Sequence, residues 1–328
     1  TTSHQNHVTT IIIIAYIVFL LHLLYNTRVG DIMETVLAKN AYKFDYFSIY
    51  EFIDKITLDP SILSHAFETE VALSEYMEDL TSHNNKVIDL FLTNAFYKEI
   101  KESNLIEGNL IYPEEILNGD IYLDTFNMNH TRIKNLHHFI ERGTGSDEYR
   151  NIEAWVRLLT KDQEIIYWYG AKPKDIFRFM EDFIKLYNDS NVFGDNIFLK
   201  CILIHLILVK IHPFKDGNGR TTRLISDIKF TEMINNLYGL DLKISPLHIS
   251  QSIYRNKATY NKKLDNICFD LEHFSNSNVN DWFNFMLNMY DEQLYYMANL
   301  LKRSKVALEN ANAMLNDKFE ISKHLILK

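Results

Sequence analysis

Glycine and proline are scarce in this chain of 328 residues, which contains 10 and 5 of them. Both residue types favour the tight turns that join short strands, so their scarcity disfavours a turn-rich β architecture and excludes collagen-like or low-complexity sequence. With 47% hydrophobic and 23% charged residues, the chain can bury the core of one large domain or two modest ones. The composition therefore predicts a mainly helical globular protein.

Cysteine and positive charge are also in short supply. The two cysteines, Cys201 and Cys268, lie in apolar surroundings without the spacing of metal ligands or of a redox pair, which indicates two reduced core thiols. Such thiols suit a reducing compartment, and we expect a cytoplasmic protein. A net charge of -9 provides no basic surface for a phosphate backbone, so a nucleic acid is not expected as the main ligand.

One long apolar run lies near the N-terminus, at residues 11–24. Counted from residue 8 to residue 25 it reaches about 18 residues, close to the lower limit for a membrane-spanning helix. No positive segment precedes the run and no small-residue cleavage site follows it, so it is a poor secretory signal. Two interpretations stay open. Residues 8–25 form a membrane anchor, or residues 1–32 are a leader upstream of a true start at Met33.

Apolar residues recur at three- and four-residue steps along most of the chain, which predicts amphipathic helices from about residue 31 to 101. Asp59-Pro60 is expected to end one helix and begin the next. A β-hairpin is predicted where two β-branched and aromatic runs flank the polar turn 161–163. Further helices are expected at 131–142, 174–188, 194–211, 218–236 and 280–315.

A dense group of polar residues follows the apolar helix that ends near residue 211. Two glycines bracket Asn218, so the backbone can approach a ligand closely, and the next helix directs its free N–H groups to the same point. Arg220 and Arg223 share a helix face and can both reach a polyphosphate. We therefore predict an anion site formed by Gly217, Asn218, Gly219, Arg220 and Arg223.

Two further residues of this group suggest the chemistry. Asp216 beside bound phosphates would be repelled unless a cation bridges them, and a hard ion such as Mg²⁺ binds through one carboxylate and phosphate oxygens. Asp216 is thus the predicted metal ligand, and Mn²⁺ is the alternative to Mg²⁺. His212, with a side-chain pKa near neutrality, can take a proton from an attacking hydroxyl and is the predicted catalytic base.

Residues 212–223 match every fixed position of the Fic motif, H-x-F-x-(D/E)-G-N-G-R-x-x-R, and the chain resembles this family over about residues 100–290. The resemblance implies an all-α fold, a Fic-type helical bundle with a small β-hairpin flap that holds a target segment by strand addition. Residues 155–169 lie where that flap belongs. The flap residues expected to bind a target are Ile165, Ile166 and Tyr167.

A second stretch, Ser103 to Asn109, resembles the family's inhibitory motif, (S/T)-x-x-x-E-(G/N). Ser103 and Glu107 are four residues apart on one helix face, and Gly108 suits a position just past the helix end. A carboxylate placed there could pair with Arg223 and compete with the γ-phosphate of ATP. An inhibitory helix is therefore predicted at 101–108.

The resemblance implies a protein adenylyltransferase that passes AMP from ATP to a Ser, Thr or Tyr hydroxyl of a target protein, or of itself, and that Glu107 inhibits. The alternatives are removal of AMP, transfer of another nucleotide or of a phosphate group, and a non-catalytic regulatory binding module. Gly219 argues against phosphate transfer, which goes with another residue at this position in the family. Intact His212 and Asp216 argue against a pure binder. A homodimer is left open.

The expected organisation has four parts. Residues 1–32 form the leader, 33–100 an N-terminal helical region, 101–290 the Fic domain with its inhibitory helix, and 291–328 a C-terminal helix and tail.

Overall fold

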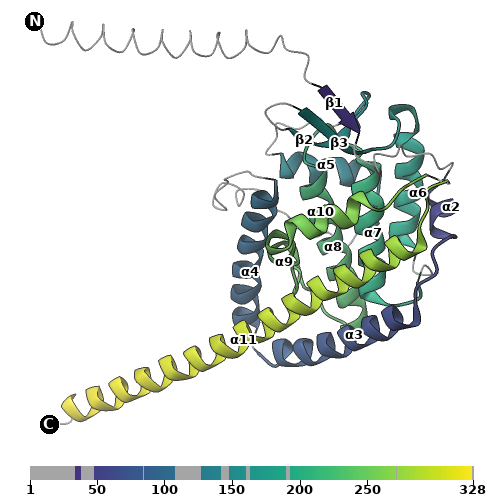
Figure 1. Ribbon diagram of the computed structural model, residues 1–328. Coiled ribbons are helices and arrows are strands. Elements are labelled where there is room, and N and C mark those ends of the chain that lie inside the picture. Colours follow the sequence, from purple (N-terminus) through teal and green to yellow (C-terminus); the bar gives the residue numbers. More distant parts are fainter. Residues whose placement is uncertain are drawn as a thin grey trace, which may run out of the picture.

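The computed structural model describes residues 34–37, 48–83, 85–107, 127–141, 148–159, 163–189, 193–270 and 272–326 (Figure 1). Two helices lie at its centre, α7 (Ile197–Ile211) and α8 (Asn218–Tyr238). Every residue of α7 is buried. A helix that is apolar on all sides avoids water only when other elements surround it, which explains its central place.

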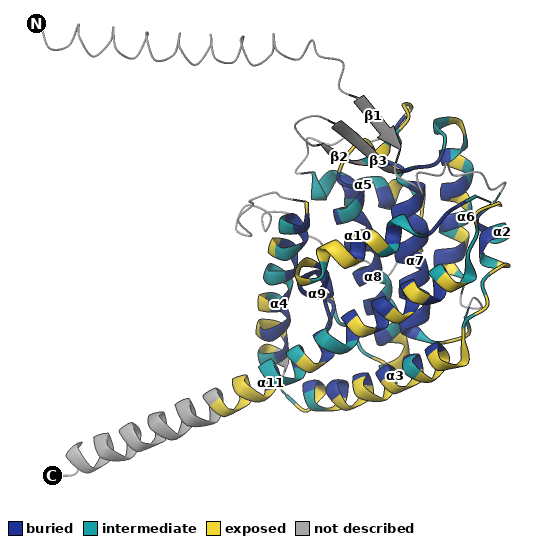
Figure 2. Ribbon diagram, viewed as in Figure 1, coloured by how far each residue is buried: buried dark blue, intermediate teal, exposed yellow. Residues whose placement is uncertain are grey.

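The remaining helices surround this central pair, and most turn one face inward and the other to solvent (Figure 2). Their bounds are α2 (Ile49–Ile53), α3 (Pro60–Thr81), α4 (Asn85–Ile106), α5 (His130–Ile140), α6 (Ile176–Asn188), α9 (Ser250–Arg255), α10 (Lys257–Asp265) and α11 (Asn276–Ile326), with a short 3₁₀ turn at Pro173–Asp175. The prediction of a mainly helical fold is confirmed. The helices α9 and α10 were not predicted.

The N-terminal helices share the core of the rest of the molecule. Helix α3 begins at Pro60, with Asp59 as its extended N-cap, as predicted. Its buried residues belong to the same hydrophobic cluster as those of α7 and α8. Helix α4 crosses the predicted boundary at residue 100 without a break, and α11 crosses the one at residue 290.

A small sheet covers one end of the bundle (Figure 1). The strands β2 (Trp155–Leu159) and β3 (Gln163–Tyr169) pair antiparallel, which confirms the predicted hairpin. Strand β1 (Glu34–Leu37) adds to the other edge of β3 in parallel, so the order is β1-β3-β2. The helix expected over 34–37 is therefore wrong. The β-branched pair Thr35-Val36 favours a strand once an edge is available for pairing.

Three sequence predictions fall outside the residues that the structure describes. They are the leader at 1–32, the end of the inhibitory motif at Gly108 and Asn109, and the turn residues Lys161 and Asp162. Within the described part of the chain, no helix combines the length and the apolar character that a bilayer crossing requires.

Candidate active site

His212 lies where α7 ends, and its backbone is in the left-handed region at φ 54° and ψ 58°. A residue other than glycine rarely adopts this conformation, and such strain is typical of functional positions. Nδ1 of the ring lies 3.2 Å from the carbonyl oxygen of Val209, which can accept its N–H and leave a lone pair on Nε2. Burial lowers the pKa of His212 to about 4, so the ring is neutral at pH 7 and able to accept a proton.

Arg150 holds the backbone of this histidine in place. Its Nε donates to the carbonyl oxygen of His212 at 2.7 Å, and its other nitrogens donate to the carbonyl oxygens of Ile152 and Ala171. Arg150 is 5% exposed. The side chain therefore ties the end of α7 to the segment after β3. The ring of Trp168 on β3 meets that of His212 edge-on, with centroids 5.3 Å apart.

Hydrogen bonds between residues of the loop itself hold the segment between α7 and α8 in its conformation. Oδ1 of Asn218 accepts from the backbone N–H of Phe214 at 2.8 Å, and Nδ2 donates to the carbonyl oxygen of Phe214 at 2.9 Å. The buried ring of Phe214 stacks on His137 at 3.7 Å. Because the Asn218 side chain is engaged within the loop, its backbone N–H is the group that remains for an anion, as for other residues in the first turn of a helix.

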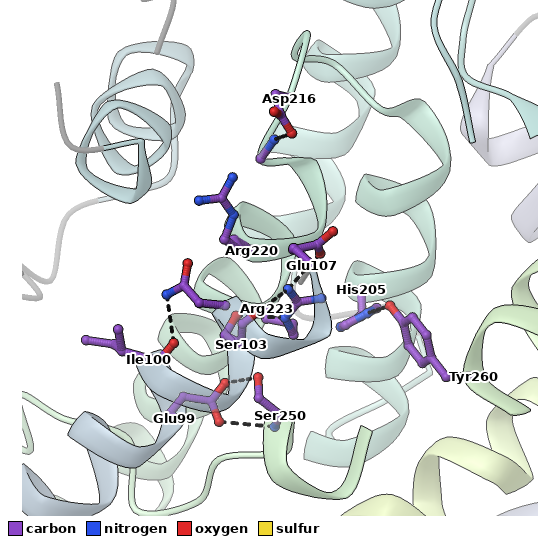
Figure 3. A network of polar contacts seen from close by, with 12 residues as sticks. Glu99, Ile100, Ser103, Glu107, His205, Asp216, Arg220, Arg223, Ser250 and Tyr260 are labelled. Carbon is purple, nitrogen blue, oxygen red and sulfur yellow. Dashed lines mark hydrogen bonds and ion pairs between the residues drawn. The ribbon is translucent and has the colours of Figure 1, made fainter. Parts of the chain in front are cut away.

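Asp216 lies at the exposed tip of this loop (Figure 3). Its Oδ1 accepts from the backbone N–H of Gly217 at 2.7 Å. An exposed carboxylate beside the N-terminus of α8 has oxygen lone pairs available to a hard cation that also binds phosphate oxygens. The donor chemistry thus fits the predicted Mg²⁺.

The predicted contact between the inhibitory motif and Arg223 is present. Nε of Arg223 donates to the Ser103 hydroxyl at 2.8 Å, and Nη2 donates both to the Ser103 carbonyl oxygen and to Oε1 of Glu107, each at 2.9 Å (Figure 3). Ser103 belongs to the last turn of α4, whose carbonyls have no partner within the helix. Arg223 therefore caps the negative end of α4 and binds Glu107 with the same side chain.

The carboxylate of Glu107 also lies against the anion loop. A Cβ added at Gly219 would come within 2.3 Å of Oε1 of Glu107 and 3.1 Å of Nη1 of Arg223. Burial raises the pKa of Glu107, but the charge and the hydrogen bond of Arg223 outweigh it and the pKa is lowered. The group is therefore ionised at neutral pH, at a position that a phosphate bound to Arg223 and the loop would need.

A second glutamate, which sequence reasoning missed, occupies the other arginine. Glu141, just after α5, lies 2.7 Å from Nη2 of Arg220. A Cβ added at Gly217 would come within 2.1 Å of its Oε1. Burial raises the pKa of Glu141 more than Arg220 lowers it. Each arginine of the motif is thus paired with a carboxylate, and each carboxylate touches one of the two glycines.

A cavity of about 650 Å³ lies beside His212 and the Glu107–Arg223 pair. His212, Arg223, Gly219 and Glu107 line one side, and α10 lines the other with residues that the sequence did not single out. A cavity of this size suits a ligand as large as a nucleotide. The residues from α10 are Lys257, Ala258, Tyr260, Asn261, Lys262, Leu264 and Asp265.

The strand expected to bind a target already has a partner. Strand β1 runs along the predicted flap residues, with Val36 opposite Ile165 and Leu37 opposite Ile166. The side chain of Ile166 is buried, at 4% exposure. The edge of β3 thus accepts an added parallel strand, and in this structure the strand comes from the same chain.

Comparison with known proteins agrees with the fold and with the loop after α7. Residues 127–228 match the model of the Fic/DOC family, so the chain contains a Fic/DOC family domain. Proteins of this family typically transfer nucleotide or phosphate groups onto other proteins.

Two solved structures share this fold. One is a Fic family protein from Desulfovibrio desulfuricans G20, with 16% identity and a TM-score of 0.54 over 74% of this chain and 76% of that one. The other is a Fic domain containing signaling protein from Bacteroides thetaiotaomicron VPI-5482, with 16% identity and a TM-score of 0.52 over 71% of this chain and 96% of that one. At such identities the likeness concerns the fold alone, which confirms the predicted Fic-type bundle.

Proposed function

We propose that this protein is an adenylyltransferase that passes AMP from ATP to a Ser, Thr or Tyr hydroxyl of a protein, and that Glu107 inhibits it in the resting state. One observation carries the proposal. A neutral histidine, Arg223 and Gly219 in the first turn of α8 line one nucleotide-sized cavity, and Glu107 of the same chain is paired with Arg223.

The chain's own residues perform most of this reaction by placing charge. Once Glu107 leaves, Arg223 is available to the terminal phosphate of ATP, while Arg220 and the N–H groups of Asn218 and Gly219 bind the others. The N–H of Gly217 joins them once Asp216 turns from it to a cation. Asp216 would hold Mg²⁺ or Mn²⁺, which neutralises phosphate charge when bound. Nε2 of His212 accepts the proton of the target hydroxyl as its oxygen bonds to the α-phosphorus, and pyrophosphate leaves with the electron pair of the broken bond.

The target segment is proposed to bind as a strand beside Ile165, Ile166 and Tyr167. Support comes from β1, which uses this edge of β3 through backbone pairing. Because β3 leads toward Trp168 and His212, a strand on its edge is directed to the catalytic base. A protein target would then compete with β1, and a hydroxyl near β1 is a candidate for self-labelling.

The experiment compares ATP labelled at the α-phosphate with ATP labelled at the γ-phosphate, in a lysate, using Glu107→Gly protein. We expect transfer of the α-label only. His212→Ala in the same background should reduce labelling by about 10²–10⁴-fold while ATP still binds, because the phosphate-binding groups are unchanged. Transfer of the γ-label, or α-labelling that survives His212→Ala, would contradict the proposal.

A further inference from the structure

Three ionisable side chains meet behind the Arg223 contact, outside the cavity that His212 faces. They are Glu99 on α4, Asp227 on α8 and His248 in the segment before α9. One nitrogen or oxygen from each lies within 4.8 Å of the others, and the residues are 7%, 8% and 3% exposed. Three distant parts of the chain thus place two carboxylates and an imidazole together in the interior.

The hydrogen bonds of this cluster leave one nitrogen unused. Nδ1 of His248 lies 2.8 Å from Oδ2 of Asp227, and Glu99 accepts from the backbone N–H and the hydroxyl of Ser250 (Figure 3). An ion shared with Asp227 would therefore bind Nδ1, the ring nitrogen that faces this carboxylate, and take the place of the proton between the two atoms, while Nε2 on the opposite side of the ring would carry the imidazole N–H. Nε2 of His248 is buried and has no hydrogen-bond partner among the described residues.

Neither carboxylate of the cluster forms an ion pair with a lysine or an arginine among the described residues. Arg223, one turn before Asp227 on α8, is already bound to Ser103 and Glu107. A buried carboxylate without a cationic partner takes up a proton or binds a metal ion. A divalent cation would match two carboxylates and a neutral imidazole, giving a site without net charge.

Space for the remaining ligands lies beside the cluster. Glu99 and His248 line a cavity of about 570 Å³ between α4, α9 and α11, and the amides of Gln251 and Gln293 line it as well. This cavity could supply water molecules to complete the coordination of an ion. It is separate from the cavity lined by His212, because the two have no lining residue in common.

We propose that Glu99, Asp227 and His248 bind one divalent transition-metal ion, of which Zn²⁺ is the best match. An imidazole nitrogen with carboxylate oxygens suits zinc and its neighbours, whereas Mg²⁺ prefers oxygen ligands and keeps its water. The site is distinct from the Asp216 position, which would hold Mg²⁺ only together with phosphates.

The proposed metal site lies next to the contact between α4 and Arg223, so a bound ion would also affect that contact. Glu99, Ser103 and Glu107 follow one another at four-residue steps on or just after α4, while Arg223 and Asp227 are four residues apart on α8. An ion held by Glu99 and Asp227 joins these two helices next to the Ser103–Arg223 contact. It therefore holds Glu107 against Arg223, and this part of the inference rests on the proposed function.

The binding test uses Co²⁺, whose visible absorption reports its ligands, added to the full chain after metal removal and without nucleotide. We expect saturable binding of one ion per chain that Zn²⁺ displaces. His248→Gln and Glu99→Gln should each weaken it at least about tenfold. His273→Gln, in an exposed group of acidic residues at 270–273, and Asp216→Asn are the matched controls and should leave binding unchanged.

Three results would overturn the site. They are the absence of saturable Co²⁺ binding, binding that both His248→Gln and Glu99→Gln retain, and binding that His273→Gln removes. If one of the two site variants fails to fold, the other decides. Zn²⁺ should also raise the Tm of the wild-type protein, because an ion that binds only the native state stabilises it. An unchanged Tm at saturating Zn²⁺ would count equally against the site.

The coupling to inhibition has a separate readout. Zn²⁺ should lower α-label transfer by the wild-type protein and leave the Glu107→Gly variant unaffected. Equal effects on both proteins would overturn the coupling and leave the metal site to the Co²⁺ titration. If neither protein transfers label under any condition, the proposed function fails, whereas the titration still decides the site.

Discussion

The two arginines of the motif lie one turn apart on α8, but they are held in different ways. Arg223 is 1% exposed and donates to the Ser103 hydroxyl, the Ser103 carbonyl and Glu107. Arg220 is paired with Glu141, and its buried Nε has no hydrogen-bond partner among the described residues. Arg223 is therefore locked by a helix end as well as by a carboxylate, whereas Arg220 keeps unused capacity for a phosphate.

The two glutamates that pair with these arginines, Glu107 and Glu141, also differ in their pKa and in their place relative to the cavity. The pKa of Glu107 is lowered from its ordinary value, while that of Glu141 is raised because burial outweighs the charge of Arg220. The Glu107 side chain remains 37% exposed, and it borders the nucleotide-sized cavity. Under the proposed function, we therefore expect Glu107 to control access to the site, and Glu141 to hold Arg220 in position until phosphate binds.

The largest effect is expected from Glu107→Gly. Release of Arg223 should raise labelling of self and target more than tenfold, since ATP gains the arginine and can also take its productive position. The measurement is the initial rate with α-labelled ATP. Arg223→Ala added to this variant should remove the gain. An unchanged rate in a folded Glu107→Gly protein would mean that the Glu107–Arg223 pair is structural and not inhibitory.

Ser103→Ala tests the part of the lock that the helix end provides. The variant loses the hydroxyl that accepts from Nε of Arg223, and one hydrogen bond of about 1 kcal/mol corresponds to roughly a fivefold change. We expect a rise in labelling of that order, smaller than for Glu107→Gly. Ser64→Ala on the exposed face of α3 is the control. A Ser103→Ala protein as silent as the wild type would show that Glu107 alone holds Arg223.

Glu141→Gln should have a weaker effect of another kind. Arg220 loses a partly buried ionic partner, so ATP affinity should rise about two- to threefold, consistent with a modest ion pair. The rate at saturating ATP should not change, because Arg223 remains bound to Glu107. Calorimetric titration with ATP measures the affinity, with Glu148→Gln as a surface control. Activation as large as that of Glu107→Gly would mean that the two arginines are equivalent.

The smallest effect is expected from pH. As the pH falls below neutral, Glu141 takes up a proton before Glu107 does, since its pKa is raised and that of Glu107 is lowered. Mild acid should therefore free Arg220 while Arg223 stays paired. The measurement is the ratio of the ATP affinities of wild type and Glu141→Gln at each pH, and this ratio should approach one as the pH falls. Protonation of ATP itself affects both proteins equally and cancels in the ratio. A constant ratio would contradict the assignment.

The part of the site that could be predicted from sequence is the part that is contiguous. His212 to Arg223 lie on one loop and the first two turns of α8, and the spacing of Ser103 and Glu107 follows the helix period. The alternation at 155–169 likewise predicted the hairpin. In each case the local geometry depends on residues that are close together in the chain, so the sequence pattern is enough to predict it.

The remaining features depend on tertiary packing. Glu141 reaches Arg220 across 79 residues, and nothing distinguishes it in sequence from an exposed helix-end glutamate. The same holds for the cluster around Glu99. Strand β1 is only four residues long and forms because β3 offers an edge. Helix α10 buries only Tyr260 and Leu264, too few apolar residues for a clear helical pattern.

The close approach at Gly219 has a genetic consequence. The same missing Cβ admits the Glu107 carboxylate and would admit a phosphate, so any larger residue there should disturb both. A selection for overactive variants should therefore rarely recover changes at this glycine. Gain-of-function substitutions should instead map to the last turns of α4, where Ser103 and Glu107 can change while the anion loop stays intact.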